Sequence, residues 1–204
     1  MADPKVSILN QIELEGRSYS ATLVASVDEL LKQAGVRLQD LRALVAVSGP
    51  GSFTGVRVGL SAVKGLAEAA GIPIAAVSRL EVLSAKAGVQ SSALDAHRSE
   101  VFLRIGLSGQ EPRELLAGAA ELGAMDMAPQ ENAVCDDAAE ELLKTTWPSA
   151  RIVRVSAPDA GDAIRLAAVR VLAGEFVDPV LLDGHYLRRS DAEIFGELGA
   201  VRPL

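Results

Sequence analysis

The sequence is poor in cysteine and in aromatic residues. One cysteine, Cys135, occurs among 204 residues, which excludes a framework of internal disulfides and is typical of a reducing compartment. Aromatic residues make up 3% of the chain, too few for the stacking platforms that bind single-stranded nucleic acid. The net charge of −7 argues against broad electrostatic binding of RNA or DNA by this chain alone.

Long apolar runs are also missing. No stretch of about 18 consecutive apolar residues occurs, so the sequence predicts no membrane span, and the first residues carry no signal-peptide pattern. We therefore expect a cytoplasmic protein. What the chain has is a hydrophobic content of 49%, mostly Ala, Val and Leu, which is enough for a well-buried core.

The order of apolar and polar residues predicts an α/β protein. Strands are expected at residues 6–15, 43–47, 74–77, 92–105, 132–135 and 151–155, and helices at residues 18–34, 56–70, 78–87, 114–123, 137–145 and 159–173. The segment 43–77 is a strand–helix–strand unit, and we expect its two strands to be parallel with a right-handed crossover. A mostly extended tail follows from residue 177.

A loop over residues 106–112 suggests two lobes. We expect an N-terminal lobe over residues 5–105 and a smaller C-terminal α/β lobe with its tail over residues 106–204.

Three glycines and a proline mark the loop at residues 49–55, between a strand and a helix. Glycines let backbone N–H groups point toward an anion, and a helix N-terminus favours negative charge. The loop matches neither the Walker pattern, nor the dinucleotide fingerprint, nor the nucleophile elbow. The alternative is a tight turn that lets the backbone pack against a neighbouring chain. The candidate anion or nucleotide loop consists of Gly49, Gly51, Ser52, Thr54 and Gly55.

Metal-ligating and nucleophilic patterns are weak. Asp95 lacks the second carboxylate that a metal or water-activating role usually requires. His97 and His185 are far apart without a nearby cysteine or histidine, so we expect surface or hydrogen-bonded histidines, not a zinc site. Cys135 has no neighbouring His or Lys and is expected to be buried and unreactive.

Four stretches carry a resemblance to a known family. The sequence GPGSFTGVRVGL at residues 49–60, followed by KGLA at residues 64–67, strongly resembles the bacterial TsaB (YeaZ) family. LDAHRSEVF at residues 94–102 is similar to a strand pair of that family, and HYLR at residues 185–188 to its tail. The resemblance implies a two-lobed ribonuclease-H-like (actin-like ATPase) fold with mixed sheets flanked by helices.

The chain departs from the family pattern in two places. The first strand of the family, with its Leu-Asp-Thr-Ser phosphate loop, is missing, and we expect that roughly 20–30 residues are absent at the N-terminus. The glycine-rich segment of the second lobe is replaced by Cys135, Asp136 and Asp137, which removes two glycines that would let the backbone approach a phosphate. Both departures weaken the expectation that this chain binds ATP.

The resemblance implies a non-catalytic scaffold or activator subunit. Its partners would be a TsaD-like catalytic subunit and a TsaE-like ATPase, which together install threonylcarbamoyl on adenosine 37 of tRNAs that read codons starting with A. It implies a homodimer in isolation, contact with tRNA only through the complex, no cofactor for this chain alone, and ATP with magnesium in the complex. The alternatives are a phosphotransferase or hydrolase that uses the loop at residues 51–55 and a metal-dependent glycoprotease-like peptidase, although the His-x-x-x-His motif of the latter is missing.

Small residues favour an interface on the helices at residues 18–34 and 56–70. Glycine costs about 1 kcal/mol relative to alanine in a helix interior, so Gly59 and Gly65 suggest a packing reason. Either a partner helix approaches them closely, or they pack against the chain's own sheet. The expected interface residues are Tyr19, Ser20, Leu23, Val27, Gly55, Val56, Gly59, Leu60 and Val63.

Overall fold

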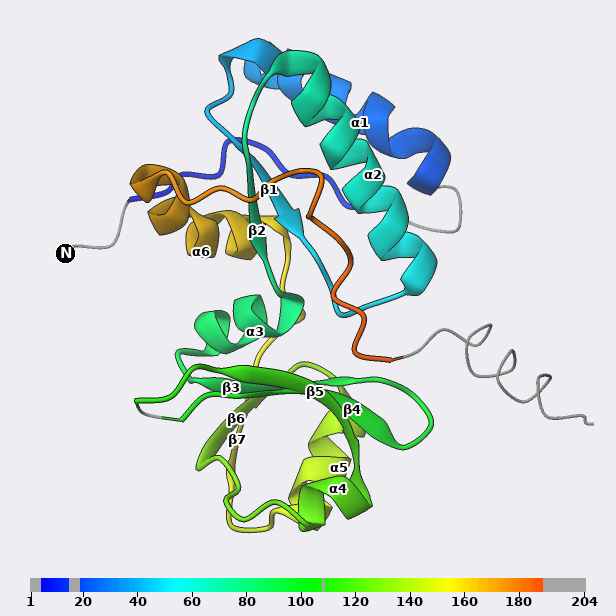
Figure 1. Cartoon of the computed structure of the whole chain (residues 1–204), viewed down its shortest axis with the longest axis vertical. Coiled ribbons are helices and arrows are strands. Elements are labelled where there is room, and N and C mark those ends of the chain that lie inside the picture. The colour runs from blue at the N-terminus through cyan, green and yellow to red at the C-terminus, as the bar shows by residue number, and fades with distance from the viewer. Residues whose placement is uncertain (1–4, 15–18, 108, 189–204) are drawn as a thin grey trace, which may run out of the picture.

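A computed structural model describes residues 5–14, 19–107 and 109–188, and its strands form two separate sheets (Figure 1). The first sheet is a parallel pair, β1 and β2, and the second has five strands in the order β5-β4-β3-β6-β7. Both sheets carry helices. The bounds of the strands are β1 Leu44–Val47, β2 Ile74–Val77, β3 Ser91–Asp95, β4 Glu100–Ile105, β5 Arg113–Gly118, β6 Glu131–Val134 and β7 Arg151–Arg154.

The bounds of the helices agree with most of the predicted ranges. They are α1 Tyr19–Ala34, α2 Phe53–Ala70, α3 Arg79–Ala87, α4 Ala119–Gly123, α5 Asp137–Thr146 and α6 Ala160–Ala173, with a short 3₁₀ turn at Leu38–Asp40. None of the helices in the described part of the chain is long and apolar enough to cross a membrane.

The first sheet is covered by helices on both faces. Alternate side chains of β1 and β2 point to opposite faces. Ala46 and Ile74 pack with Leu60 of α2, whereas Ala75 and Val77 pack with Ala163 and Ala167 of α6. α1 packs against α2, and together they form the outer layer on that side (Figure 1). We call β1, β2, α1, α2 and α6 the first lobe.

The second sheet is mixed. β4 is antiparallel to β3 and β5, and β6 is parallel to β3 and β7. α4 and α5 pack on one face, where Val101, Leu103 and Leu143 are buried. We call β3–β7, α4 and α5 the second lobe.

α3 lies between the two lobes (Figure 1). Its Leu80 and Leu83 pack with Leu94 of the second sheet, and its Val82 packs with Val77 of the first. A helix that is buried on two sides joins the sheets through one continuous apolar contact. After β7 the chain returns through α6 to the first lobe, and residues 174–188, here called the tail, run back toward the second lobe.

The boundary expected between residues 105 and 106 falls inside the second sheet and does not separate the two sheets. β4 and β5 lie on either side of that boundary and are paired from Glu100 and Gly118 to Ile105 and Arg113. α6 and the tail, which were expected in the C-terminal lobe, contact the first sheet.

Two predicted elements are wrong. The strand predicted over residues 6–15 does not form in its described part, since residues 5–14 have no strand partner and instead place Ile8 and Gln11 against Gly161 of α6; residue 15 lies outside the described residues. The first half of the helix predicted over residues 114–123 is instead part of strand β5, because pairing with β4 outweighs the local helical pattern, and the second half is helix α4.

Alanine in place of two glycines should have opposite effects on stability. A Cβ atom at Gly106 would lie 2.5 Å from the carbonyl oxygen of Gln90, so Gly106→Ala should lower the free energy of unfolding by about 1–3 kcal/mol. Gly65 lies inside α2 with nothing within 4 Å of such an atom, so Gly65→Ala should raise it by about 0.5–1 kcal/mol. Urea unfolding of both variants measures the two effects, and equal stability of the pair would contradict this packing.

Candidate functional site

A pocket of about 440 Å³ lies where the two lobes and the tail meet. We call it the interlobe pocket. Three segments and two single residues line it: the loop before α2 with the first turn of that helix, the turn between β3 and β4, the end of the tail, Arg79 and Phe102.

The loop before α2 depends on Gly49. This residue has a φ of +114°, and a Cβ atom there would lie 3.4 Å from the carbonyl oxygen of His185. The backbone holds the neighbouring segments directly. The His185 N–H donates to the Ser48 carbonyl at 2.7 Å, and the Arg79 N–H donates to the Gly49 carbonyl at 2.6 Å. A side chain at Gly49 would therefore press on the tail.

The predicted anion loop is only partly at the pocket. Gly51 and Ser52 line it, whereas Gly49, Thr54 and Gly55 do not. Ser52 is the N-cap of α2, and its hydroxyl oxygen accepts a hydrogen bond from the Gly55 N–H at 3.4 Å. The serine and the glycine thus form a helix cap, which is the ordinary use of these residue types at this position.

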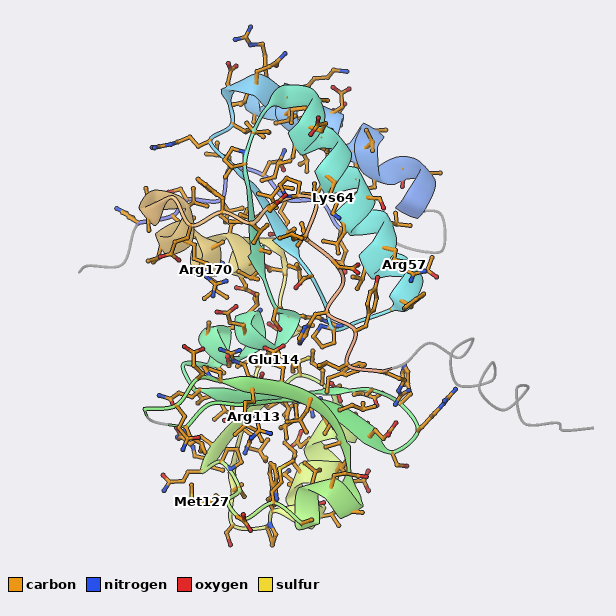
Figure 2. All side chains as sticks on the ribbon, viewed as in Figure 1. Arg57, Lys64, Arg113, Glu114, Met127 and Arg170 are labelled. Carbon is orange, nitrogen blue, oxygen red and sulfur yellow. The ribbon has the colours of Figure 1, made fainter. Side chains whose placement is uncertain are left out.

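An aromatic and cationic cluster closes one side of the pocket. The rings of Phe53 and Tyr186 lie 4.9 Å apart between centroids, and the Arg57 guanidinium lies 3.8 Å from the Phe53 centroid. Arg57 also donates a hydrogen bond to the Tyr186 hydroxyl at 3.2 Å, and Figure 2 shows Arg57 at the lower end of α2. The cluster joins the start of α2 to the tail.

The turn between β3 and β4 contributes polar groups. His97, Arg98 and Ser99 all have a φ near +60°, an unfavourable conformation for non-glycine residues. Asp95 stabilises the turn, since its carboxylate accepts from the His97 N–H at 2.7 Å and lies 2.9 Å from His97 Nδ1. His97 is 85% exposed, so it is the surface, hydrogen-bonded histidine that was predicted.

Basic side chains outnumber acidic ones around the pocket. Arg79, Arg98, Arg188 and two histidines line it, against one carboxylate, Asp95. Arg188 pairs with Glu100 on β4. Among the described residues, Arg79 has no ion-pair partner in the structure. The lining can therefore attract an anion.

Glu114 joins the lobes behind the pocket. Its carboxylate accepts from the Ser78 hydroxyl at 2.6 Å, pairs with Arg104 at 2.9 Å, and lies 3.0 Å from His185 Nε2. The Glu114 side chain is 8% exposed, and Figure 2 shows it between α3 and the second sheet. His185 is thus hydrogen-bonded, as predicted.

The predicted interface residues differ in where they point. Val56, Leu60 and Val63 face the first sheet, and Leu60 is 5% exposed in the chain's own core. Gly59 faces open space, with nothing within 4 Å of a built Cβ atom. Leu23 and Val27 on α1 are half-buried, and Gly55 is half-buried in the first turn of α2. The side chains of Tyr19 and Ser20 lie outside the described residues.

Sequence reasoning missed Glu114 and Arg79. Glu114 was hidden because its segment was predicted as a helix, where a glutamate is an ordinary surface residue. Arg79 looked like part of a helix start. The residues next to them in the sequence do not mark either one as part of a site. The partners of Glu114 come from other elements, and Arg79 reaches the pocket only in the folded chain.

Two further kinds of candidate group are metal ligands and the Cys135 thiol. Within residues 5–14, 19–107 and 109–188 no group of three His, Cys, Asp or Glu side chains could hold a metal ion. Burial raises the pKa of the half-buried Cys135 thiol, and the neighbouring Asp136 raises it further.

Comparison with known proteins gives consistent relatives. A family model described as TsaD: tRNA N6-adenosine threonylcarbamoyltransferase matches residues 7–112. The tRNA threonylcarbamoyladenosine biosynthesis protein TsaB of Bacillus subtilis is 40% identical over 90 residues, which are 42% of this chain and 39% of that protein. A tRNA N6-adenosine threonylcarbamoyltransferase of Agrobacterium fabrum is 45% identical over 69 residues, which are 34% of this chain and 19% of that protein. The chain thus spans less than half the length of these curated relatives.

The similarity to a solved structure covers more of the molecule. YeaZ from Pseudomonas aeruginosa superposes with a TM-score of 0.69 at 28% identity, over 86% of this chain and 87% of that chain. The expected α/β fold, with mixed sheets flanked by helices, is therefore confirmed, and it is consistent with the actin-like ATPase fold.

Removal of the Glu114 carboxylate should destabilise the protein strongly. Glu114→Ala leaves the Arg104 guanidinium, which is 17% exposed, without its carboxylate, and should cost about 3 kcal/mol of unfolding free energy. Urea unfolding measures this cost. The matched control is Glu111→Ala in the exposed loop, with an expected change within about 0.5 kcal/mol. Equal stabilities of the two variants would refute the joining role of Glu114.

Cys135 should react slowly with alkylating reagents. Because the pKa of its thiol is raised, the reactive thiolate is scarcer at neutral pH than in an exposed cysteine, and alkylation should accelerate only at higher pH. Iodoacetamide labelling followed by mass spectrometry measures the rate. The same chain unfolded in urea is the control, and equal rates in the two states would contradict the burial effect.

Proposed function

The chain belongs to the TsaD family of tRNA N6-adenosine threonylcarbamoyltransferases, as its resemblance to TsaB (YeaZ) proteins predicted, and we propose that it is a non-catalytic subunit of this tRNA modification. In this proposal it binds and activates a TsaD-like catalytic subunit that transfers threonylcarbamoyl to adenosine 37 of tRNAs reading codons that start with A. It does so in the cytoplasm, together with a TsaE-like ATPase.

The observation that carries the proposal is the outer layer of α1 and α2. This layer covers one face of the first sheet, and Val24 on α1 is 51% exposed. Apart from the neighbouring residues and backbone of α2 itself, no atom lies within 4 Å of the place that a Cβ atom would take at Gly59 or Gly65. Packing inside the chain therefore does not explain why α2 has glycine at these two positions, where glycine destabilises a helix. The close approach of a partner helix is a physical reason for them.

Ser52, Asp95 and Glu114, at or behind the pocket, already have hydrogen-bond or ion-pair partners within the chain, which also supports an accessory role. The Ser52 hydroxyl caps α2, and Asp95 is engaged by His97 and its turn. Glu114 is held by Ser78, Arg104 and His185. These groups serve the structure of the chain, and a net charge of −7 favours contact with tRNA through a partner. We propose that the first lobe carries the partner interface and that the isolated chain forms homodimers.

Substitution of Gly59 tests the interface. Gly59→Glu adds a charged side chain where the chain itself leaves room, so the fold should persist and affinity for the TsaD-like subunit should fall at least about tenfold. Calorimetric titration of the two purified subunits measures the affinity. Ser149→Glu, an exposed position in the second lobe, is the control and should bind as the unaltered chain does. Unchanged binding of Gly59→Glu would refute the α2 interface.

A nucleotide-binding phosphotransferase or hydrolase is the second candidate, and the basic lining of the interlobe pocket is the observation that favours it. Calorimetric titration with ATP and magnesium discriminates between the two functions. The accessory role predicts no tight binding by the isolated chain. Binding at micromolar ATP that is lost in Arg79→Ala would favour the enzyme, because Arg79 lines the pocket without an ion-pair partner among the described residues.

A further inference from the structure

Another pocket, of about 380 Å³, lies at the other end of β3 from the interlobe pocket. It is lined by residues of α3, of the segment between α3 and β3, of β4 and of the loop after β4, and by Leu166 of α6. The interlobe pocket includes Asp95, at the end of β3, whereas this pocket includes Gln90, just before β3. We call it the back pocket. Its volume is in the range of about 300–1,000 Å³ that is typical of small-molecule sites.

Two charged residues of opposite sign line the back pocket in the part of the chain that the structure describes. Arg104 on β4 is 17% exposed, and Glu81 on α3 is 18% exposed. Each has a partner that does not line the pocket: Arg104 Nη1 donates to Glu114 at 2.9 Å, and Glu81 Oε1 accepts from Arg170. The lining therefore has no net charge, and each of its two charges is balanced by a residue outside it.

Part of each charged group has no partner. Arg104 Nε is buried and donates no hydrogen bond within the described residues. A buried donor without an acceptor costs free energy, and such groups are rare in folded proteins. The second carboxylate oxygen of Glu81, Oε2, has no hydrogen-bond partner among the described residues either. The back pocket thus combines a guanidinium that lacks an acceptor with a carboxylate oxygen that can still accept.

We propose that the back pocket binds a free α-amino acid as its zwitterion. The carboxylate of the amino acid accepts hydrogen bonds from the Nε side of Arg104, where a guanidinium can donate two in parallel. The ammonium group donates to Glu81 and to the hydroxyl oxygen of Ser84, whose own hydrogen is donated to the Glu81 carbonyl at 3.0 Å. A ligand with one charge of each sign and no net charge matches such a lining.

The apolar part of the lining accommodates the side chain of the amino acid. Val89, Pro112 and Leu166 line the same pocket. An aliphatic side chain loses contact with water against these residues, which favours binding. A charged side chain would have no partner among the described lining residues, because Arg104 and Glu81 hold the two charges of the main chain. The site should therefore prefer amino acids such as leucine to glutamate or lysine.

This site is independent of the proposed tRNA-modification function. Leu166 belongs to α6, which lies on the face of the first sheet opposite α2, so a ligand in the back pocket leaves the α1–α2 layer free. Gly59→Glu should bind leucine as the unaltered chain does. Variants of the back pocket should still bind the TsaD-like subunit, and each proposal can thus fail without the other.

Calorimetric titration of the full chain with L-leucine tests the proposal. The dissociation constant should be below about 1 mM. 4-Methylpentanoate, which is leucine without the ammonium group, and 3-methylbutylamine, which is leucine without the carboxylate, should each bind at least about tenfold more weakly, since each leaves one charge of the lining without a partner. Equal affinity for the three compounds, or no binding of leucine at millimolar concentration, overturns the zwitterion site.

A bulky substitution at Ala85 locates the binding site. Ala85 is an exposed residue of α3 that lines the back pocket, so Ala85→Trp should fill part of the pocket without changing the core. Leucine should then bind at least about tenfold more weakly. Ala138→Trp, at an exposed position of α5, is the matched control and should bind leucine as before. Equal leucine affinity of the two variants would place the binding elsewhere and refute the site.

Arg104→Lys tests the role of the guanidinium. Lysine keeps a positive charge for Glu114 but lacks the planar pair of donors that a carboxylate accepts from, so leucine should bind at least about tenfold more weakly. Urea unfolding verifies that the variant is folded. Unchanged leucine affinity of the folded variant contradicts the assignment of the carboxylate to Arg104.

Discussion

The carboxylate of Glu114 is the contact on which the relation between the two lobes depends. It accepts a hydrogen bond from Ser78 at the end of the first sheet, pairs with Arg104 in the second sheet, and lies beside His185 in the tail. Burying a carboxylate to 8% exposure costs free energy unless such partners surround it. The Glu114 carboxylate thus contacts both lobes and the tail, and the interlobe pocket lies beside it.

α3 adds an apolar and an ionic connection to that contact. Its leucines pack on the second sheet, while Lys86 pairs with Asp162 at 2.7 Å and Glu81 pairs with Arg170, both on α6. Apolar packing thus holds α6 against the first sheet, and two ion pairs hold it against α3.

Much of the first lobe could be predicted because its signals are local. Gly71, with a φ of +65°, marks the end of α2 in the sequence itself, and β1 and β2 are parallel as predicted. The candidate site was harder to predict from the sequence. The glycine loop was found from its composition, but its Ser52 proved to be a helix cap, and Glu114 was hidden in a segment that looked helical.

The sequence by itself determined the α/β class, most helices and the resemblance to the family, because capping residues, apolar periodicity and a specific motif act over short distances along the chain. Only the tertiary structure decided that residues 113–118 pair with β4 as a strand and that residues 5–14 remain without one. It also decided the pocket and the Glu114 contact, whose partner Ser78 lies 36 positions away. Strand pairing and buried charges depend on groups that are distant in the sequence, and folding alone brings those groups together.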